Sequence, residues 1–140
     1  MKDKIFIDTN ILIYLVNKDA DFHEDVREVF ENLQKDCELW ISGQVLREYA
    51  VIMTRPGFLA KTLTTQELIS DIHVFRSLFN VATETERVLN IFSDLVEHYH
   101  ISGKRIHDVN IVATMMAFSV TRLFTKNTKD FMIFKEIDLL

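Results

Sequence analysis

The sequence predicts an α/β fold in which a mostly parallel central sheet is flanked by helices. Short apolar segments alternate along the chain with longer segments of helical periodicity, the pattern expected of such a sheet. Only three glycines and one proline interrupt the 140 residues, and we find no internal repeat, so we expect one domain over residues 1–140. The 48% hydrophobic content is enough for one substantial core.

Five short apolar segments predict strands, at residues 4–7, 39–41, 79–82, 122–125 and, more weakly, 137–140. Six segments with an apolar stripe predict the helices between them, at residues 11–16, 22–33, 45–53, 68–75, 88–99 and 108–119. Ser42 is placed to cap the third helix. Capping boxes, which place a Glu three residues after the cap, predict three further helix starts, at Asp21/Glu24, Thr64/Glu67 and Thr83/Glu86.

The composition argues against a membrane-spanning or secreted protein. No apolar run approaches the roughly 20 residues that a membrane span requires. The apolar run that ends at Asp8 is too short for a signal peptide. The single cysteine, Cys37, cannot form an intrachain disulfide, which agrees with a reducing compartment. We therefore expect a cytoplasmic protein without a membrane partner.

The charge is unevenly distributed along the chain. The net charge of −5 argues against nucleic-acid binding through bulk positive charge. Residues 101–135, however, contain six basic and two acidic residues, an excess of four positive charges. The first 36 residues contain nine acidic and five basic ones. A basic tract beside an acidic pocket would suit a phosphate backbone held against metal ions, although ordinary surface asymmetry explains the pattern equally well.

Acidic residues stand at positions where parallel sheets bind ligands, which is beyond the carboxyl ends of the strands. Asp8 directly follows the first predicted strand, where it could also serve as a helix N-cap. Glu48 shares a helix face with apolar neighbours, and the alternative is an exposed Glu paired with Arg47 or Arg55. Asp108 lies in the first turn of a helix on its apolar side, where N-capping is again the alternative.

A fourth polar segment, Thr125 to Phe131, follows a predicted strand and places Asn127 and Asp130 at that strand's end, where a simple polar turn is the alternative. Two carboxylates about 5 Å apart repel by roughly 3 kcal/mol at an effective dielectric near 20. A fold keeps several such groups together only with a cation or with raised pKa values. Carboxylate oxygens without cysteine or paired histidine ligands favour Mg²⁺ or Mn²⁺. Phosphodiester hydrolysis is therefore the leading chemistry.

These residues resemble a known family over essentially the whole chain. Residues 5–14 (IFIDTNILIY) resemble the opening motif of PIN domains, especially toxin nucleases of the VapC type. The resemblance continues through residues 42–49, which end in Arg-Glu-Tyr, and through Ile-His-Asp at 106–108. It ends with residues 123–131 (LFTKNTKDF). Many relatives have aspartate at the position of Asn127.

The resemblance implies a PIN-like three-layer sandwich with Mg²⁺/Mn²⁺-dependent endoribonuclease activity on RNA. It implies a catalytic set of four acids, of which the first three bind metal: Asp8, Glu48, Asp108 and Asp130. It also implies a supporting or substrate-side set: Thr9, Asn10, Arg47 and Asn127. Whether Asn127 or Asp130 fills the fourth position stays open. Relatives commonly form homodimers, and toxin members are inhibited by a cognate antitoxin whose segment enters the active-site groove.

Two other functions are compatible with part of this pattern. A PIN domain without catalysis could act as a nucleic-acid- or protein-binding module, but all three core acids are present. A phosphatase of the haloacid-dehalogenase type, with Asp8 as nucleophile, needs a second aspartate two residues later, where this chain has Asn10. The resemblance therefore implies a metal-dependent ribonuclease that is the toxin of a toxin–antitoxin pair, whereas the carboxylates themselves indicate only phosphodiester hydrolysis.

Overall fold

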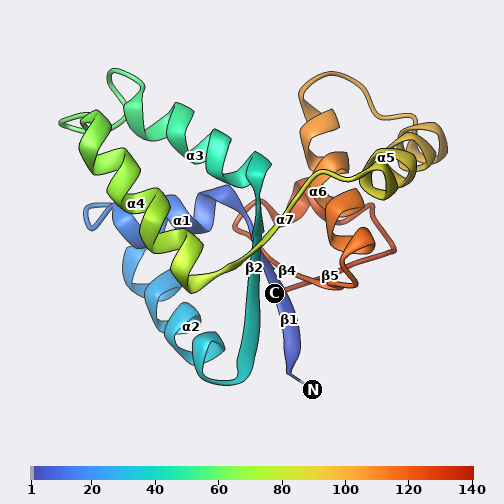
Figure 1. Cartoon of the computed structure of the whole chain (residues 1–140), viewed down its shortest axis with the longest axis horizontal. Helices are drawn as coiled ribbons and strands as arrows, with labels where there is room; N and C mark the ends of the chain where they lie inside the picture. The colour runs from blue at the N-terminus through green and yellow to red at the C-terminus, as the bar shows by residue number, and fades with distance from the viewer. Residues whose placement is uncertain (1) are drawn as a thin grey trace.

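The computed structural model describes residues 2–140 and has a five-stranded sheet at its centre (Figure 1). The strands are β1 (Asp3–Ile7), β2 (Cys37–Ser42), β3 (Asn80–Ala82), β4 (Arg122–Phe124) and β5 (Asp138–Leu139). Their order across the sheet is β3-β2-β1-β4-β5, and every neighbouring pair is parallel. The predicted parallel α/β sheet is confirmed.

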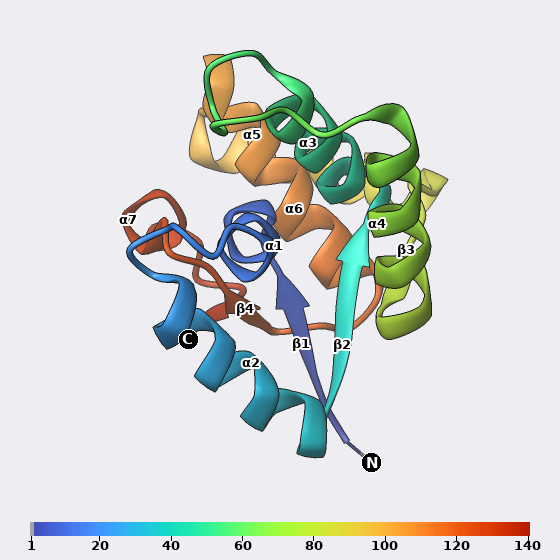
Figure 2. The ribbon, with the colours of Figure 1, turned by 90° about the vertical axis from the view of Figure 1, so that its left-hand side faces the viewer.

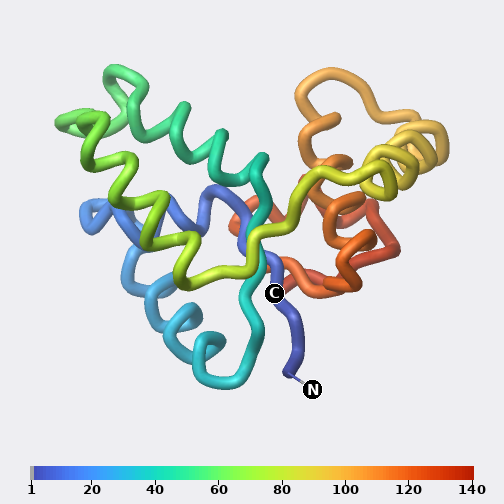
Figure 3. Tube along the Cα trace, viewed as in Figure 1, coloured from blue at the N-terminus to red at the C-terminus, as the bar shows by residue number. Residues whose placement is uncertain are grey.

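Helices cover both faces of the sheet. They are α1 (Thr9–Val16), α2 (His23–Asp36), α3 (Gly43–Thr54), α4 (Thr65–Leu78), α5 (Glu86–Tyr99), α6 (Ile106–Ala117) and α7 (Thr128–Phe131), with a 3₁₀ turn η1 (Gly103–Arg105) before α6. In Figure 1, α1 to α4 lie on one side of the sheet and α5 and α6 lie on the other. The chain trace in Figure 3 passes from the first layer to the second through β3. This arrangement is the predicted three-layer sandwich.

Two of the four predicted helix starts are confirmed, and two are wrong. Ser42 caps α3 by accepting a hydrogen bond from the amide of Val45, and Thr64 and Glu67 form the complete capping box of α4. Thr83 is wrong as the cap of α5, because Thr85 accepts the hydrogen bond from the third helical amide instead.

The capping box at Asp21/Glu24 is also wrong. Helix α2 begins at His23, and no side chain caps its N-terminus. The carboxylate of Glu24 instead accepts a hydrogen bond from Arg27 at 2.8 Å. Phe22, which the pattern placed on the apolar face, is 45% exposed and packs edge-on against Tyr14.

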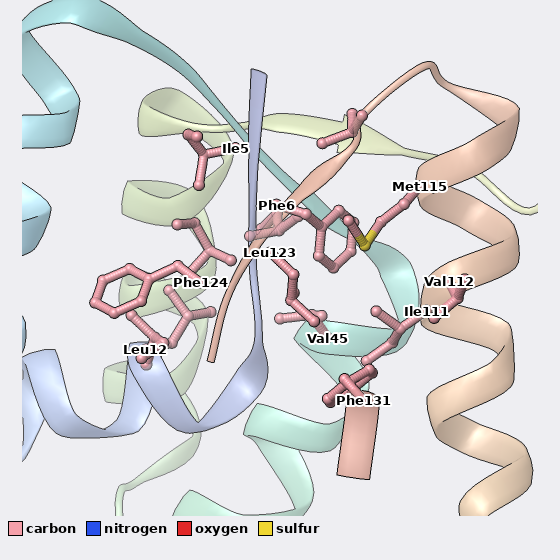
Figure 4. Close-up of a cluster of buried hydrophobic side chains, with 14 of the residues drawn as sticks. Ile5, Phe6, Leu12, Val45, Ile111, Val112, Met115, Leu123, Phe124 and Phe131 are labelled. Carbon is pink, nitrogen blue, oxygen red and sulfur yellow. The ribbon is translucent and has the colours of Figure 1, made fainter. Parts of the chain in front are cut away.

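The core lies on both faces of the central strand β1. Ile5 and Ile7 of this strand are completely buried. Figure 4 shows the surrounding cluster, in which side chains from β1, β4, α1, α3 and α6 pack together. Phe131 of α7 is 1% exposed and lies in the same cluster, so its burial fixes the short helix after β4 against the domain. Within residues 2–140, no helix combines the length and the apolar character needed to cross a bilayer.

Candidate active site

The carboxyl ends of β1 and β4 bring Asp8 and Thr125 together. In Figure 2 the arrows of β1 and β2 point to the same edge of the sheet, toward α1 and α3. Strand β4 is the other neighbour of β1, and the amide of Asp8 donates to the carbonyl of Phe124 at 3.1 Å. The first residues beyond these strands are therefore adjacent, as the parallel arrangement predicts.

Asp8 is 5% exposed and accepts hydrogen bonds at both carboxylate oxygens. Its Oδ1 accepts from the amide of Thr9 at 2.8 Å, which is a helix-capping contact. Its Oδ2 accepts from the hydroxyl of Thr125 at 2.7 Å and from Nδ2 of Asn10 at 3.1 Å. Helix capping, the alternative role, thus accounts for one oxygen only, and the other is held by side chains around the strand ends.

Thr125 is a further site residue, which the sequence pattern did not indicate. It is 1% exposed, and its hydroxyl donates to Asp8 while accepting from the amide of Asn127 at 3.0 Å. Asn10 joins the same group, because its Oδ1 accepts from the amide of Lys126 at 3.1 Å. The only sequence signal was the position of Thr125 at the end of a strand.

Glu48 reaches the site from α3, and neutral donors hold its carboxylate. Oε2 accepts from the hydroxyl of Thr9 at 2.8 Å, and Oε1 accepts from Nε2 of Gln44 at 2.8 Å. The alternative partners Arg47 and Arg55 are absent from the ion pairs formed within residues 2–140. The alternative of a surface ion pair is therefore wrong, and Thr9 connects Glu48 to the residue that follows Asp8.

Asp108 lies in the first turn of α6, as predicted, but the N-capping alternative is wrong because Arg105 holds the cap position. Its side chain is 24% exposed and lies 4.0 Å from Nε of Arg105. The pKa of Asp108 is raised to about 6, mainly by burial and in addition by the negative charges of Asp130, Asp8 and Glu48, while the nearby Arg105 acts in the opposite direction. The charges of all four acids therefore act on one region of space.

Burial also raises the pKa of Asp8. The hydrogen bonds from Thr125, Thr9 and Asn10 act in the opposite direction, and the negative charge of Glu48 adds to the increase. The two aspartates thus share two causes of a raised pKa, which are loss of water and the charges of neighbouring carboxylates.

Asp130 and Asn127 are both exposed residues of the segment around α7. The charge of Asp130 contributes to the raised pKa of Asp108, and its backbone carbonyl accepts from Nη2 of Arg105 at 2.6 Å. Asn127 precedes α7, and its side chain makes no capping hydrogen bond. Its backbone amide donates to the hydroxyl of Thr125. Asp130 therefore acts on the cluster through its charge, whereas Asn127 is attached to it through its backbone.

The donor atoms fit a hard divalent cation. Among residues 2–140, no three acidic, histidine or cysteine side chains are gathered tightly enough to form a ready-made metal-binding group. The negative charges of neighbouring carboxylates nevertheless help to raise the pKa values of Asp8 and Asp108. A divalent cation between them would relieve this repulsion, and oxygen-only donors favour Mg²⁺ or Mn²⁺. The acidic cluster (Asp8, Glu48, Asp108 and Asp130) is thus chemically suited to such an ion.

A groove of about 680 Å³ opens beside Glu48. Its cationic lining side chains are Arg47, Arg55 and Lys104, and His107 also faces it. Apolar atoms of Val51 and Ile52 complete the wall formed by α3. The groove therefore combines positive charge and apolar surface next to the acidic cluster, a combination that suits a phosphate backbone carrying bases.

The sequence matches a known protein family, and the fold matches solved structures. The PIN domain family model matches residues 5–138. The chain belongs to the PIN domain family. No curated protein sequence matches the chain, but solved structures share the PIN fold at low sequence identity.

Three of these structures illustrate the similarity. A chain of VapBC2 from Rickettsia felis, bound to a DNA fragment from its promoter, superposes with a TM-score of 0.72 at 22% identity, covering 98% of this chain and 97% of that one. FitAcB from Neisseria gonorrhoeae gives a TM-score of 0.70 at 16% identity, covering 97% and 96%. VapC20 from Mycobacterium tuberculosis, described as a sarcin–ricin loop cleaving toxin, gives 0.64 at 16% identity, covering 85% and 86%.

Proposed function

We propose that this PIN domain is a Mg²⁺- or Mn²⁺-dependent endoribonuclease that hydrolyses RNA phosphodiester bonds. The observation that carries the proposal is the raised pKa of Asp108, about 6, which three other acids of the cluster help to produce. Asp8, Glu48 and Asp108 would hold the metal, with Asp130 as the fourth acid. The bound metal would supply an activated water and neutralise charge on the scissile phosphate.

The chain's own residues would do the positioning. Thr9 and Asn10 orient Asp8 and Glu48 through the hydrogen bonds described above. Arg47, Arg55 and Lys104 line the groove beside Glu48 and would bind the RNA backbone. The similar structure of VapC20 is that of a toxin that cleaves the sarcin–ricin loop, which supports an RNA substrate for this chain.

The test compares wild type with Asp8→Asn on a mixed RNA substrate in the presence of Mg²⁺, Mn²⁺ or EDTA. Asp8→Asn keeps the shape of the side chain and one oxygen but removes a charge from the cluster. We expect wild type to cleave with either metal, EDTA to abolish cleavage, and the variant to lose at least about 100-fold in rate. Equal cleavage by the two proteins would contradict the mechanism and favour a PIN domain that only binds its partner.

We further propose that the protein is the toxin of a toxin–antitoxin pair. The similar chains belong to VapBC and FitAB structures, and one from Klebsiella pneumoniae is described as a toxin–antitoxin complex. The groove of about 680 Å³ beside Glu48, with apolar atoms of Val51 and Ile52 and the cations Arg47 and Arg55 in its lining, would accept the inhibitory antitoxin segment. A small open reading frame beside the gene, whose product co-purifies with this chain and suppresses its cleavage, is the expected result.

A homodimer is the proposed assembly. Leu89 of α5 is 53% exposed and lines a hollow of about 260 Å³ together with Phe92 and Ile106. Apolar surface of this kind is typical of protein–protein contacts. Light scattering coupled to size exclusion should give twice the 16.4 kDa monomer mass for wild type and the monomer mass for Leu89→Asp.

A further inference from the structure

We propose that Gln44 is a positioning residue that fixes the carboxylate of Glu48 for metal binding and connects it to the helix that carries Asp108. The inference rests on the proposed function. Gln44 is 8% exposed and lies at the edge of the groove beside Glu48, so most of its side chain is removed from water. A buried amide of this kind is retained only where its donors and acceptor are satisfied, which makes its partners informative.

Both hydrogens of the Gln44 amide are used. Nε2 donates to Oε1 of Glu48 at 2.8 Å and to the backbone carbonyl of His107 at 3.0 Å. Gln44 and Glu48 lie one turn apart on α3, whereas His107 lies on α6 and directly precedes Asp108. One side chain therefore links the acid of α3 to the backbone that positions the acid of α6.

Asn110 fixes which way the Gln44 amide faces. Nδ2 of Asn110 donates to Oε1 of Gln44 at 2.7 Å and to Oε1 of Glu84 at 2.9 Å. If the Gln44 amide turned over, its oxygen would face a carboxylate and a carbonyl, and its nitrogen would face another amide nitrogen. All three pairs would repel, so the chain from Glu84 through Asn110 to Gln44 holds one orientation.

This orientation of the Gln44 amide fixes the plane of the Glu48 carboxylate. Each oxygen of a carboxylate has two acceptor positions. Thr9 occupies one position on Oε2 and Gln44 occupies one on Oε1, so the plane of the carboxylate is fixed and one position on each oxygen is left for a cation. Residues that hold metal ligands through hydrogen bonds in this way affect metal affinity without touching the metal.

The experiment measures Mn²⁺ binding by isothermal titration calorimetry in the full-length protein. Gln44→Met keeps the volume of the side chain and removes its amide. Gln34→Met makes the same chemical change at an exposed position of α2 and is the control. We expect the Mn²⁺ dissociation constant of Gln44→Met to rise about tenfold, with the control unchanged. RNA cleavage by Gln44→Met should recover as the Mn²⁺ concentration is raised.

Asn110→Ala is the second variant, because it leaves Gln44 in place and removes only the group that orients it. We expect a weaker effect in the same direction, and thermal melting without metal shows whether each variant is folded. A dissociation constant that stays at the wild-type value in both folded variants would overturn the proposal and assign Gln44 a purely structural role. Absence of Mn²⁺ binding by wild type would overturn the proposed function itself.

Discussion

Asp8 and Asp108 contribute to the same acidic cluster, but the protein holds them differently. Asp8 is 5% exposed and accepts three hydrogen bonds, from Thr9, Asn10 and Thr125. The carboxylate of Asp108 accepts no hydrogen bond within residues 2–140, and its nearest cation is Arg105 at 4.0 Å. The folded chain thus organises Asp8 in advance, whereas Asp108 depends on a bound cation for its counter-charge. Removing a hydrogen bond to Asp8 should therefore lower the stability of the protein, whereas removing the charge of Asp108 should raise the stability of the metal-free protein.

The largest effect on the free energy of unfolding is expected from removing a hydrogen bond to Asp8. Thr125→Val removes the buried hydroxyl that donates to Asp8 and accepts from the amide of Asn127. Loss of a hydrogen bond to a buried charge, together with an unsatisfied amide, should destabilise the protein by about 2–3 kcal/mol. Urea denaturation at pH 7 measures this, with the exposed Thr121→Val as control. An unchanged midpoint would mean that Asp8 is not held by these bonds.

Removing the charge of Asp108 should change the stability of the metal-free protein less than Thr125→Val does, and should increase it. Asp108→Asn removes a carboxylate whose pKa the fold raises from 3.8 to about 6. A rise of this size corresponds to about 2–3 kcal/mol of destabilisation of the charged form, so the metal-free variant should be more stable at pH 7 by up to about 2 kcal/mol. The exposed Asp94→Asn should show no such gain.

The carboxyl group of Asp108 also makes the stability of the metal-free protein depend on pH. In the unfolded chain Asp108 loses its proton near pH 3.8, and in the folded protein near pH 6. The folded state therefore binds more protons between these values, so metal-free stability should fall as pH rises through this window. Asp8 contributes in the same direction because its pKa is also raised. A stability curve with the same slope in wild type and Asp108→Asn would contradict this assignment.

The smallest expected effect concerns the fourth position of the cluster. Asp130→Asn should lower the pKa of Asp108 only part of the way toward 3.8, because burial is the larger cause of the shift. Asn127→Asp adds a negative charge in the same segment, beside Thr125, and should raise the pKa of Asp108 further. Carboxyl NMR titration of Asp108 measures both. No change in Asp130→Asn would exclude Asp130 as the fourth acid.

Much of this architecture was predictable because its signals are local. A short apolar run followed by Asp predicts a strand end, and a helix stripe places Glu48 and Asp108 on the apolar sides of their helices. Hydrogen-bond partners distant in sequence carry no such signal. Thr125 lies 117 residues from Asp8, and Gln44 lies 63 residues from His107.

Local ambiguity explains the remaining differences. Thr83 and Thr85 are both plausible caps of α5, and only the position of the chain after β3 selects Thr85. Helix α7 has four residues, which is too short for a periodic pattern, and it is held by the burial of Phe131. These features depend on tertiary packing that a single sequence does not display.

If Asp8, Glu48 and Asp108 form one divalent-cation site, crystals of the wild-type protein soaked in Mn²⁺ should bind the ion there. Anomalous diffraction at the manganese edge locates the ion. We expect a manganese peak with carboxylate oxygens of all three residues around it, at least two of them at about 2 Å. Absence of a peak at the acidic cluster, in crystals that bind Mn²⁺ elsewhere, would contradict a shared site.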